Sequence, residues 1–200
     1  MITIDARGEN CPIPVIKTKK AFDALTGAET IEVLVDNEIA VQNVTKLGRE
    51  YGGELHSEQL KDKEYKVTIQ MKDIVMQSEE EPNASNDKAG HSIAVISTAC
   101  MGNGNDKLGK VLMKGFLFAL TQLETLPKKV IFYNGGATLT CESSDSLEDL
   151  QAMEAEGVEI LTCGTCLDYY NLKGKLKVGE VTNMYSIVES MEAASKILKP

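Results

Sequence analysis

The 200-residue sequence lacks the features of two large classes of protein, membrane-spanning and nucleic-acid-binding proteins. No segment approaches the roughly 20 consecutive apolar residues that a transmembrane helix needs. Lys and Arg total 21 against 30 Asp and Glu, a formal net charge of −9, whereas binding to phosphate backbones needs clustered positive charge. We therefore expect no membrane contact and no nucleic-acid partner. Residues 2–10 carry three charges and do not resemble an apolar signal sequence, so we expect a cytoplasmic protein.

The sequence also lacks an even set of cysteines and the ligands of a common zinc site. Its five cysteines are Cys11, Cys100, Cys141, Cys163 and Cys166. An odd number in a protein expected to be cytoplasmic argues against a disulfide framework. Only one Cys-x-x-Cys pair is present, and His56 and His91 stand apart from each other and from every cysteine. We therefore expect neither a metal nor a cofactor, and the thiols are reactive or buried.

The glycine-rich turn at residues 102–109 lacks the Gly-Lys-Ser/Thr ending of a P-loop and the Rossmann glycine spacing. Its backbone N–H groups at a helix start favour either a weak anion site or simply a tight turn. Cys100 precedes this turn, and a position beside a helix start is one that raises thiol reactivity. Nothing else in the sequence marks Cys100.

An acidic stretch in the middle of the sequence indicates two domains. Residues 73–91 contain five acidic side chains and one basic one, and residues 78–90 contain no branched apolar or aromatic residue. Such a segment cannot bury enough surface to offset the entropy lost on ordering. We expect a domain at 1–72, a flexible acidic linker at 73–91 and a second domain at 92–200.

Both halves have the patterns of α/β proteins. In the first half, alternating and helical periodicities predict strands at 2–5, 30–36, 55–60 and 65–71, with helices at 12–25 and from Asn37 to about 51. One face of that sheet is apolar, so we expect a two-layer β-α-β-α-β-β sandwich. In the second half, buried strands at 92–99, 129–134 and 158–162 alternate with helices at 106–123, 144–156, after Cys166 and at 186–198. This alternation predicts a three-layer, mostly parallel sheet with helices on both faces.

The strongest chemical signal is Cys11, which precedes Pro12 and Pro14 at the predicted start of the first helix. Proline is tolerated in the first helical turn, where its missing N–H loses no hydrogen bond. Cys11 is therefore expected at or beside the N-cap, near unpaired N–H groups and the positive end of the helix dipole. Such a setting lowers a cysteine pKa and favours the nucleophilic thiolate. We predict that Cys11 is the reactive cysteine.

Residues 5–14 (DARGENCPIP) resemble the signature of the TusA/SirA family of sulfur carriers, and the resemblance extends over residues 1–72. In that family the cysteine of the Cys-Pro-x-Pro motif carries a persulfide sulfur. The sulfur comes from a cysteine desulfurase, or another persulfide donor, and passes to a further acceptor. The resemblance therefore implies that Cys11 has this role and that such donor and acceptor proteins are the partners.

The second half resembles the DsrE/DsrF-like domains of sulfur relay, through residues 101–109 (MGNGNDKLG) and 161–167 (LTCGTCL). A TusA-like domain followed by a DsrE-like one is the arrangement of the YedF-type proteins, which are assigned to selenium metabolism. The resemblance implies that sulfur or selenium is the cargo. It also implies self-association through the DsrE-like domain.

The pair Cys163 and Cys166 has three interpretations. Cys163 is a low-pKa thiolate with Cys166 as its resolving partner, or Cys163 is a relay cysteine that the DsrE resemblance implies, or both thiols are structural. We include both cysteines with Cys11 as candidate catalytic residues. The favoured function is a persulfide carrier or sulfurtransferase-like protein. Its alternatives are a thiol-disulfide redox protein centred on this pair, and a non-catalytic adaptor in which the cysteines are incidental.

Overall fold

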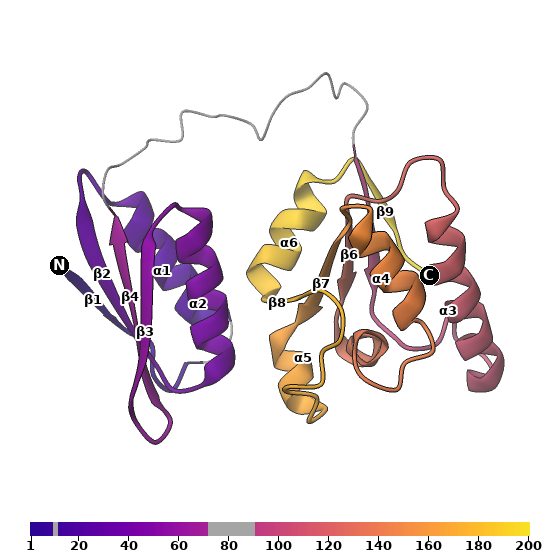
Figure 1. Cartoon of the computed structure of the whole chain (residues 1–200), viewed down its shortest axis with the longest axis horizontal. Helices are drawn as coiled ribbons and strands as arrows, with labels where there is room; N and C mark the ends of the chain where they lie inside the picture. The colour runs from indigo at the N-terminus through magenta and orange to yellow at the C-terminus, as the bar shows by residue number, and fades with distance from the viewer. Residues whose placement is uncertain (10–11, 72–90) are drawn as a thin grey trace. The chain divides into compact units, whose positions relative to one another are not determined.

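The chain divides into two compact units, residues 1–85 and 86–200 (Figure 1). The structure is a computed structural model that describes residues 1–9, 12–71 and 91–200. Apart from His91, the predicted linker at 73–91 lies outside the described residues, so its flexibility stays a prediction. Within the three described ranges, no helix has both the length and the apolarity needed to cross a bilayer.

The first unit is a four-stranded sheet with two helices packed on one face (Figure 1). Its elements are β1 (Ile2–Asp5), α1 (Ile13–Asp23), β2 (Glu29–Val35), α2 (Glu38–Glu50), β3 (Glu54–Lys61) and β4 (Glu64–Met71). The strand order is β1-β2-β4-β3, in which β1 pairs parallel with β2 and the other two pairs are antiparallel. The predicted two-layer β-α-β-α-β-β sandwich is confirmed.

Local sequence explains these elements. The alternating Ile31, Val33 and Val35 of β2 are fully buried under the helices, as a half-covered strand requires. Asn37 caps α2, as predicted, because its side-chain oxygen accepts the Ala40 N–H at 2.8 Å. Val15 and Phe22 of α1 and Val44 and Leu47 of α2 pack against this buried face of the sheet.

The second unit is a five-stranded parallel sheet. Its elements are β5 (Ser92–Ile96), α3 (Asp106–Thr121), β6 (Lys129–Phe132), the 3₁₀ helix η1 (Asn134–Thr140), α4 (Leu147–Ala155), β7 (Glu159–Cys163), α5 (Gly164–Tyr169), β8 (Glu180–Thr182), α6 (Met184–Ala193) and β9 (Lys196–Leu198). The strand order is β8-β7-β6-β5-β9 and every pair is parallel. This sheet is the parallel α/β region that the sequence predicts.

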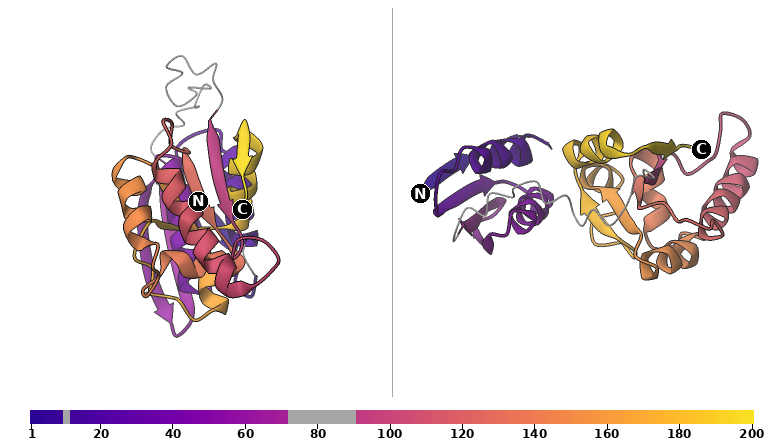
Figure 2. Two further views of the ribbon diagram at one scale, coloured as in Figure 1. Left: turned by 90° about the vertical axis from the view of Figure 1, so that its right-hand side faces the viewer. Right: turned by 90° about the horizontal axis from the view of Figure 1, so that it is seen from above.

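Helices cover both faces of this second sheet (Figure 2). Ala94 and Ile96 of β5 belong to the core cluster that α3 and α4 complete. The alternate residues Ile93 and Val95 belong to the cluster that includes Ile187 of α6. Because each central strand is buried on both faces, it appears in the sequence as a continuous apolar run.

The C-terminal end of the chain differs from the prediction. The helix predicted at 186–198 ends at Ala193, and residues 196–198 form the edge strand β9. Ser195 donates hydrogen bonds from its backbone N–H and its hydroxyl to the carbonyl of His91, at 3.1 and 2.8 Å. The helix therefore ends at a partner about 100 residues away in sequence, which local periodicity does not reveal.

Candidate functional site

The start of α1 is the first candidate site. Cys11 itself lies outside the described residues, but the structure describes the chain on both sides of it. Pro12 is the N-cap of α1 and Pro14 is in its first turn, so the predicted proline-defined helix start is confirmed. Since proline has no N–H, the backbone donors of this first turn are those of Ile13 and Val15. These donors lie two and four residues after Cys11 in the sequence.

A set of polar contacts fixes the loop that leads to Cys11. The N–H of Gly8 donates to the carboxylate of Asp36, which follows β2, at 2.6 Å. Arg7 forms two side-chain hydrogen bonds with Asp5 at the end of β1, of 2.7 and 3.0 Å. Gly8 has a φ of +75°, a left-handed conformation that glycine adopts without steric cost. The loop is thus tied to both parallel strands.

Lys17 and Glu9 add a charged pair beside this loop. The Lys17 ammonium donates to the Glu9 carboxylate at 2.7 Å and to the carbonyl of Asp5 at 3.2 Å. The second oxygen of Glu9 is buried and has no hydrogen-bond partner among the described residues. Sequence analysis did not single out Lys17 or Glu9, although both lie within six residues of Cys11.

The Asp5–Arg7 contact gives a pH prediction. Hydrogen bonding to Arg7 lowers the pKa of Asp5 to about 2. This contact stabilises the fold at pH values above the unfolded pKa of about 3.9, and the stabilisation is lost as pH falls through about 2. Arg7→Gln should raise the Asp5 pKa toward 4, which carboxyl-resonance NMR titration measures. An unchanged Asp5 titration in the variant would contradict this assignment.

The Cys163–Cys166 pair is the second candidate site. Cys163 ends β7 and is only 2% exposed. The helix α5 begins at Gly164, earlier than the predicted start after Cys166, and places Cys166 in its first turn, where it is half-buried. Burial raises the pKa of Cys163 to about 11, although the backbone N–H groups of Thr165 and Cys166 act against this shift. A raised pKa leaves Cys163 a neutral thiol at pH 7, which argues against the low-pKa thiolate, one of the three interpretations of the pair.

Cys166 has a backbone donor from a neighbouring segment. The N–H of Asn134, the first residue of η1, donates to the Cys166 sulfur at 3.0 Å. Asn134 has a φ of +49°, and its side-chain oxygen accepts the Tyr170 hydroxyl at 2.9 Å. Sequence analysis did not connect Asn134 with Cys166. Adjacent parallel strands bring them together, because their carboxyl ends meet at one edge of the sheet.

The remaining cysteines do not join either site. Cys141 is buried, its thiol donates to the carbonyl of Ala137 at 3.3 Å, and burial raises its pKa. The Cys100 thiol lies 3.6 Å from the carbonyl of Asp106 at the start of α3. Across the described ranges, no three His, Cys, Asp or Glu side chains are grouped as metal ligands would be. His56 is exposed on β3.

The glycine-rich turn before α3 is a capped helix start. The side chain of Asn105 accepts the Leu108 N–H at 3.1 Å. The N–H of Met101 donates to the carbonyl of Gly109 at 2.9 Å, which closes the turn. Both contacts favour the tight-turn interpretation over the anion site.

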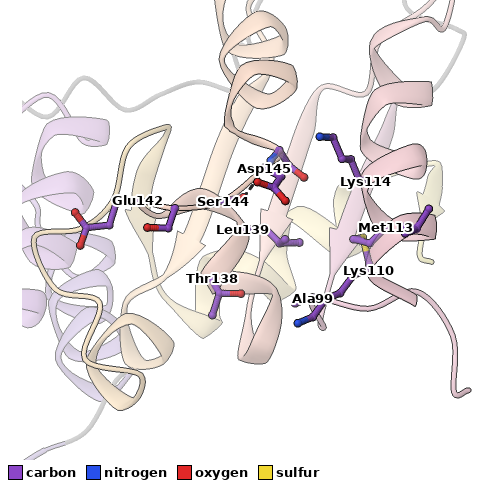
Figure 3. Close-up of a pocket in the computed structure, with 12 residues that line it drawn as sticks. Ala99, Lys110, Met113, Lys114, Thr138, Leu139, Glu142, Ser144 and Asp145 are labelled. Atoms are coloured by element: carbon purple, nitrogen blue, oxygen red, sulfur yellow. Dashed lines mark hydrogen bonds between the residues drawn. The ribbon is translucent and has the colours of Figure 1, made fainter. Parts of the chain in front are cut away.

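A cleft of about 490 Å³ lies in the second unit between α3, η1 and the loop after η1 (Figure 3). Lys114 of α3 points toward the loop that bears Asp145, and Lys110 also lines the cleft (Figure 3). Sequence analysis did not predict this cleft, because its walls come from segments about 30 residues apart. Neither Cys163 nor Cys166 lines it.

Comparison with known proteins assigns the first unit. The family model described as "Sulfurtransferase TusA" matches residues 2–71. A Thermotoga maritima protein named "Putative sulfur carrier protein" is 32% identical over 71 residues, which cover 35% of this chain and 90% of that protein. The crystal structure of a SirA-like protein from Desulfitobacterium hafniense is 40% identical over 36% of this chain and 99% of that one, with a TM-score of 0.35.

The second unit has weaker likenesses. The ychN protein from E. coli is 14% identical over 56% of this chain and 99% of that one, with a TM-score of 0.44. A likeness at this level does not assign the second unit to a family. The assignment of the chain rests on its first unit. By the match over residues 2–71, the chain belongs to the TusA sulfurtransferase family.

Proposed function

We propose that this protein is a persulfide sulfur carrier in which Cys11 holds the transferred sulfur. The observation that supports this most directly is the helix start after Cys11, where Pro12 caps α1 and Pro14 occupies its first turn. The helix dipole and the N–H groups of that turn favour a thiolate, the form that attacks a persulfide. Membership of the TusA family and the name of the Thermotoga relative support the same chemistry.

The donor in this proposal is a cysteine desulfurase or another persulfide protein, and the acceptor is a downstream sulfur or selenium protein. We further propose that the second unit is a DsrE-like domain, so that the chain has the YedF-type arrangement. The parallel sheet and the Cys-x-x-Cys pair at the end of β7 are consistent with a second thiol site in that unit. Selenium as cargo is part of the proposal through the same resemblance.

The test is a sulfur-loading reaction on the full chain. The reduced protein is incubated with a cysteine desulfurase and cysteine, and peptide mass spectrometry locates any added sulfur. We expect an adduct on the peptide that contains Cys11, and its complete loss in Cys11→Ser. Cys100→Ser is the matched control, because Cys100 is a partly exposed thiol at another helix start and its loss should leave loading unchanged.

A second arm replaces cysteine with selenocysteine and looks for the heavier selenium adduct on the same peptide. Its presence supports selenium as cargo, and its absence beside a sulfur adduct restricts the cargo to sulfur. The carrier proposal would be overturned if Cys11 is loaded with neither element. It would also be overturned if the Cys11→Ser protein takes up as much sulfur as the unmodified protein.

A further inference from the structure

The two thiols of the second unit differ in accessibility. Cys163 is 2% exposed and is part of the core cluster under α6, whereas Cys166 is half-buried and packs against the edge of the same cluster. A persulfide held by another molecule therefore reaches the sulfur of Cys166 and not that of Cys163. This order of access is the reverse of the redox-pair interpretation given above, in which Cys163 reacts first and Cys166 resolves.

A backbone donor from a neighbouring segment lies beside the Cys166 sulfur. The Asn134 N–H points at this sulfur at 3.0 Å, and the backbone that presents this donor is held by the hydrogen bond from Tyr170. After transfer, the same N–H remains beside the inner sulfur of a Cys166 persulfide.

Cys163 is placed to react with that persulfide from inside the protein. It lies three residues before Cys166, both side chains contact one core cluster, and the Cys166 backbone N–H acts on the Cys163 sulfur. Burial keeps Cys163 as a neutral thiol until it reacts. A buried thiol beside an accessible one is positioned as a resolving cysteine, because it reacts only after the accessible thiol has been modified.

We propose that the pair releases sulfide from a persulfide, with Cys166 as the accepting thiol and Cys163 as the resolving thiol. In the first step the sulfur of Cys166 attacks the outer sulfur of a donor persulfide, R–S–SH. A new S–S bond forms, the donor S–S bond breaks, and the donor sulfur takes up the proton that Cys166 gives up and leaves as the thiol R–SH. In the second step Cys163 attacks the inner sulfur of the Cys166 persulfide, and hydrosulfide leaves with the proton that Cys163 gives up.

In the net reaction, R–S–SH and the two thiols are consumed. The products are R–SH, hydrogen sulfide and a Cys163–Cys166 disulfide. The sulfane sulfur is reduced and the two cysteines are oxidised, so the electrons balance within the pair. A dithiol reductant of the thioredoxin class resets the disulfide. The substrate class is a low-molecular-weight or protein persulfide. This inference uses the proposed sulfur chemistry but does not require Cys11.

The experiment uses the full-length chain with Cys11→Ser and Cys100→Ser, so that the carrier site and the other partly exposed thiol are absent. The reduced protein is mixed with glutathione persulfide, and released sulfide and peptide masses are measured. We expect roughly one equivalent of sulfide per chain and a disulfide joining residues 163 and 166. Adding Cys163→Ser should leave a stable persulfide on Cys166 and lower sulfide release at least about tenfold.

Adding Cys166→Ser instead should abolish both products and leave Cys163 unmodified, and Cys141→Ser is the matched control for loss of a buried thiol. Circular dichroism and melting curves identify any variant that fails to fold, in which case Cys163→Ala replaces Cys163→Ser. A persulfide found on Cys163, or sulfide release that survives Cys166→Ser in a folded protein, would overturn the proposal. Because Cys11 is absent throughout, this outcome is independent of the loading test above.

Discussion

Replacing Gly179 with alanine is expected to destabilise the second unit strongly and to leave the stability of the first unit unchanged. An alanine Cβ at this position would lie 2.1 Å from the carbonyl oxygen of Ile160 in β7, and the backbone φ of +75° is itself unfavourable for alanine. The obstacle is backbone, so no side-chain rotation relieves it. We expect a loss of roughly 3–5 kcal/mol in the free energy of unfolding of this unit.

Thermal unfolding of the full chain should then show the second-unit transition shifted far down and the first-unit transition unchanged. Gly174→Ala is the matched control, because Gly174 has a φ of +74° but an added Cβ there meets no atom within 4 Å. It isolates the conformational cost, about 1–2 kcal/mol. Because β8 pairs with Cys163, the Gly179 variant should also expose Cys163 to iodoacetamide. If the two variants are equally stable, the clash with the Ile160 carbonyl does not contribute to the destabilisation, and the prediction is wrong.

Replacing Phe22 with alanine should have the complementary effect on the first unit. Phe22 holds α1 to the core at 6% exposure, and its ring stacks on Tyr51 of the α2 end at a centroid distance of 4.6 Å. Removal of a buried phenylalanine costs about 3–5 kcal/mol, comparable with the whole stability of a small domain. The first unit should therefore be largely unfolded at 37 °C, and sulfur loading of Cys11 at that temperature should fall with it.

Phe22→Leu is the control for this prediction, since it keeps most of the buried volume and should retain loading. The second-unit transition, and sulfide release by the Cys163–Cys166 pair, should be unaffected in both variants. If Phe22→Ala unfolds both units together, the two units do not unfold independently, and the prediction is contradicted.

Much of the first unit could be predicted from the sequence, because its signals are local. Alternation in 30–36 identifies a half-buried strand, and Asn37 caps the following helix through its own side chain. Pro12 and Pro14 define the start of α1 by covalent geometry. The helix start that follows Cys11 could therefore be predicted without any long-range contact.

The sequence by itself determined the two-part α/β organisation, the helix start after Cys11 and the presence of a Cys-x-x-Cys pair at a strand end. Only the tertiary structure decided the edge strands β8 and β9, the end of α6 and which thiol of the pair is accessible. These depend on partners distant in sequence: His91 for the C-terminal end, and Asn134 with the α6 core for Cys166 and Cys163. The burial and hydrogen bonding of a sulfur depend on the segments packed around it. The spacing of the cysteines in the sequence does not identify those segments.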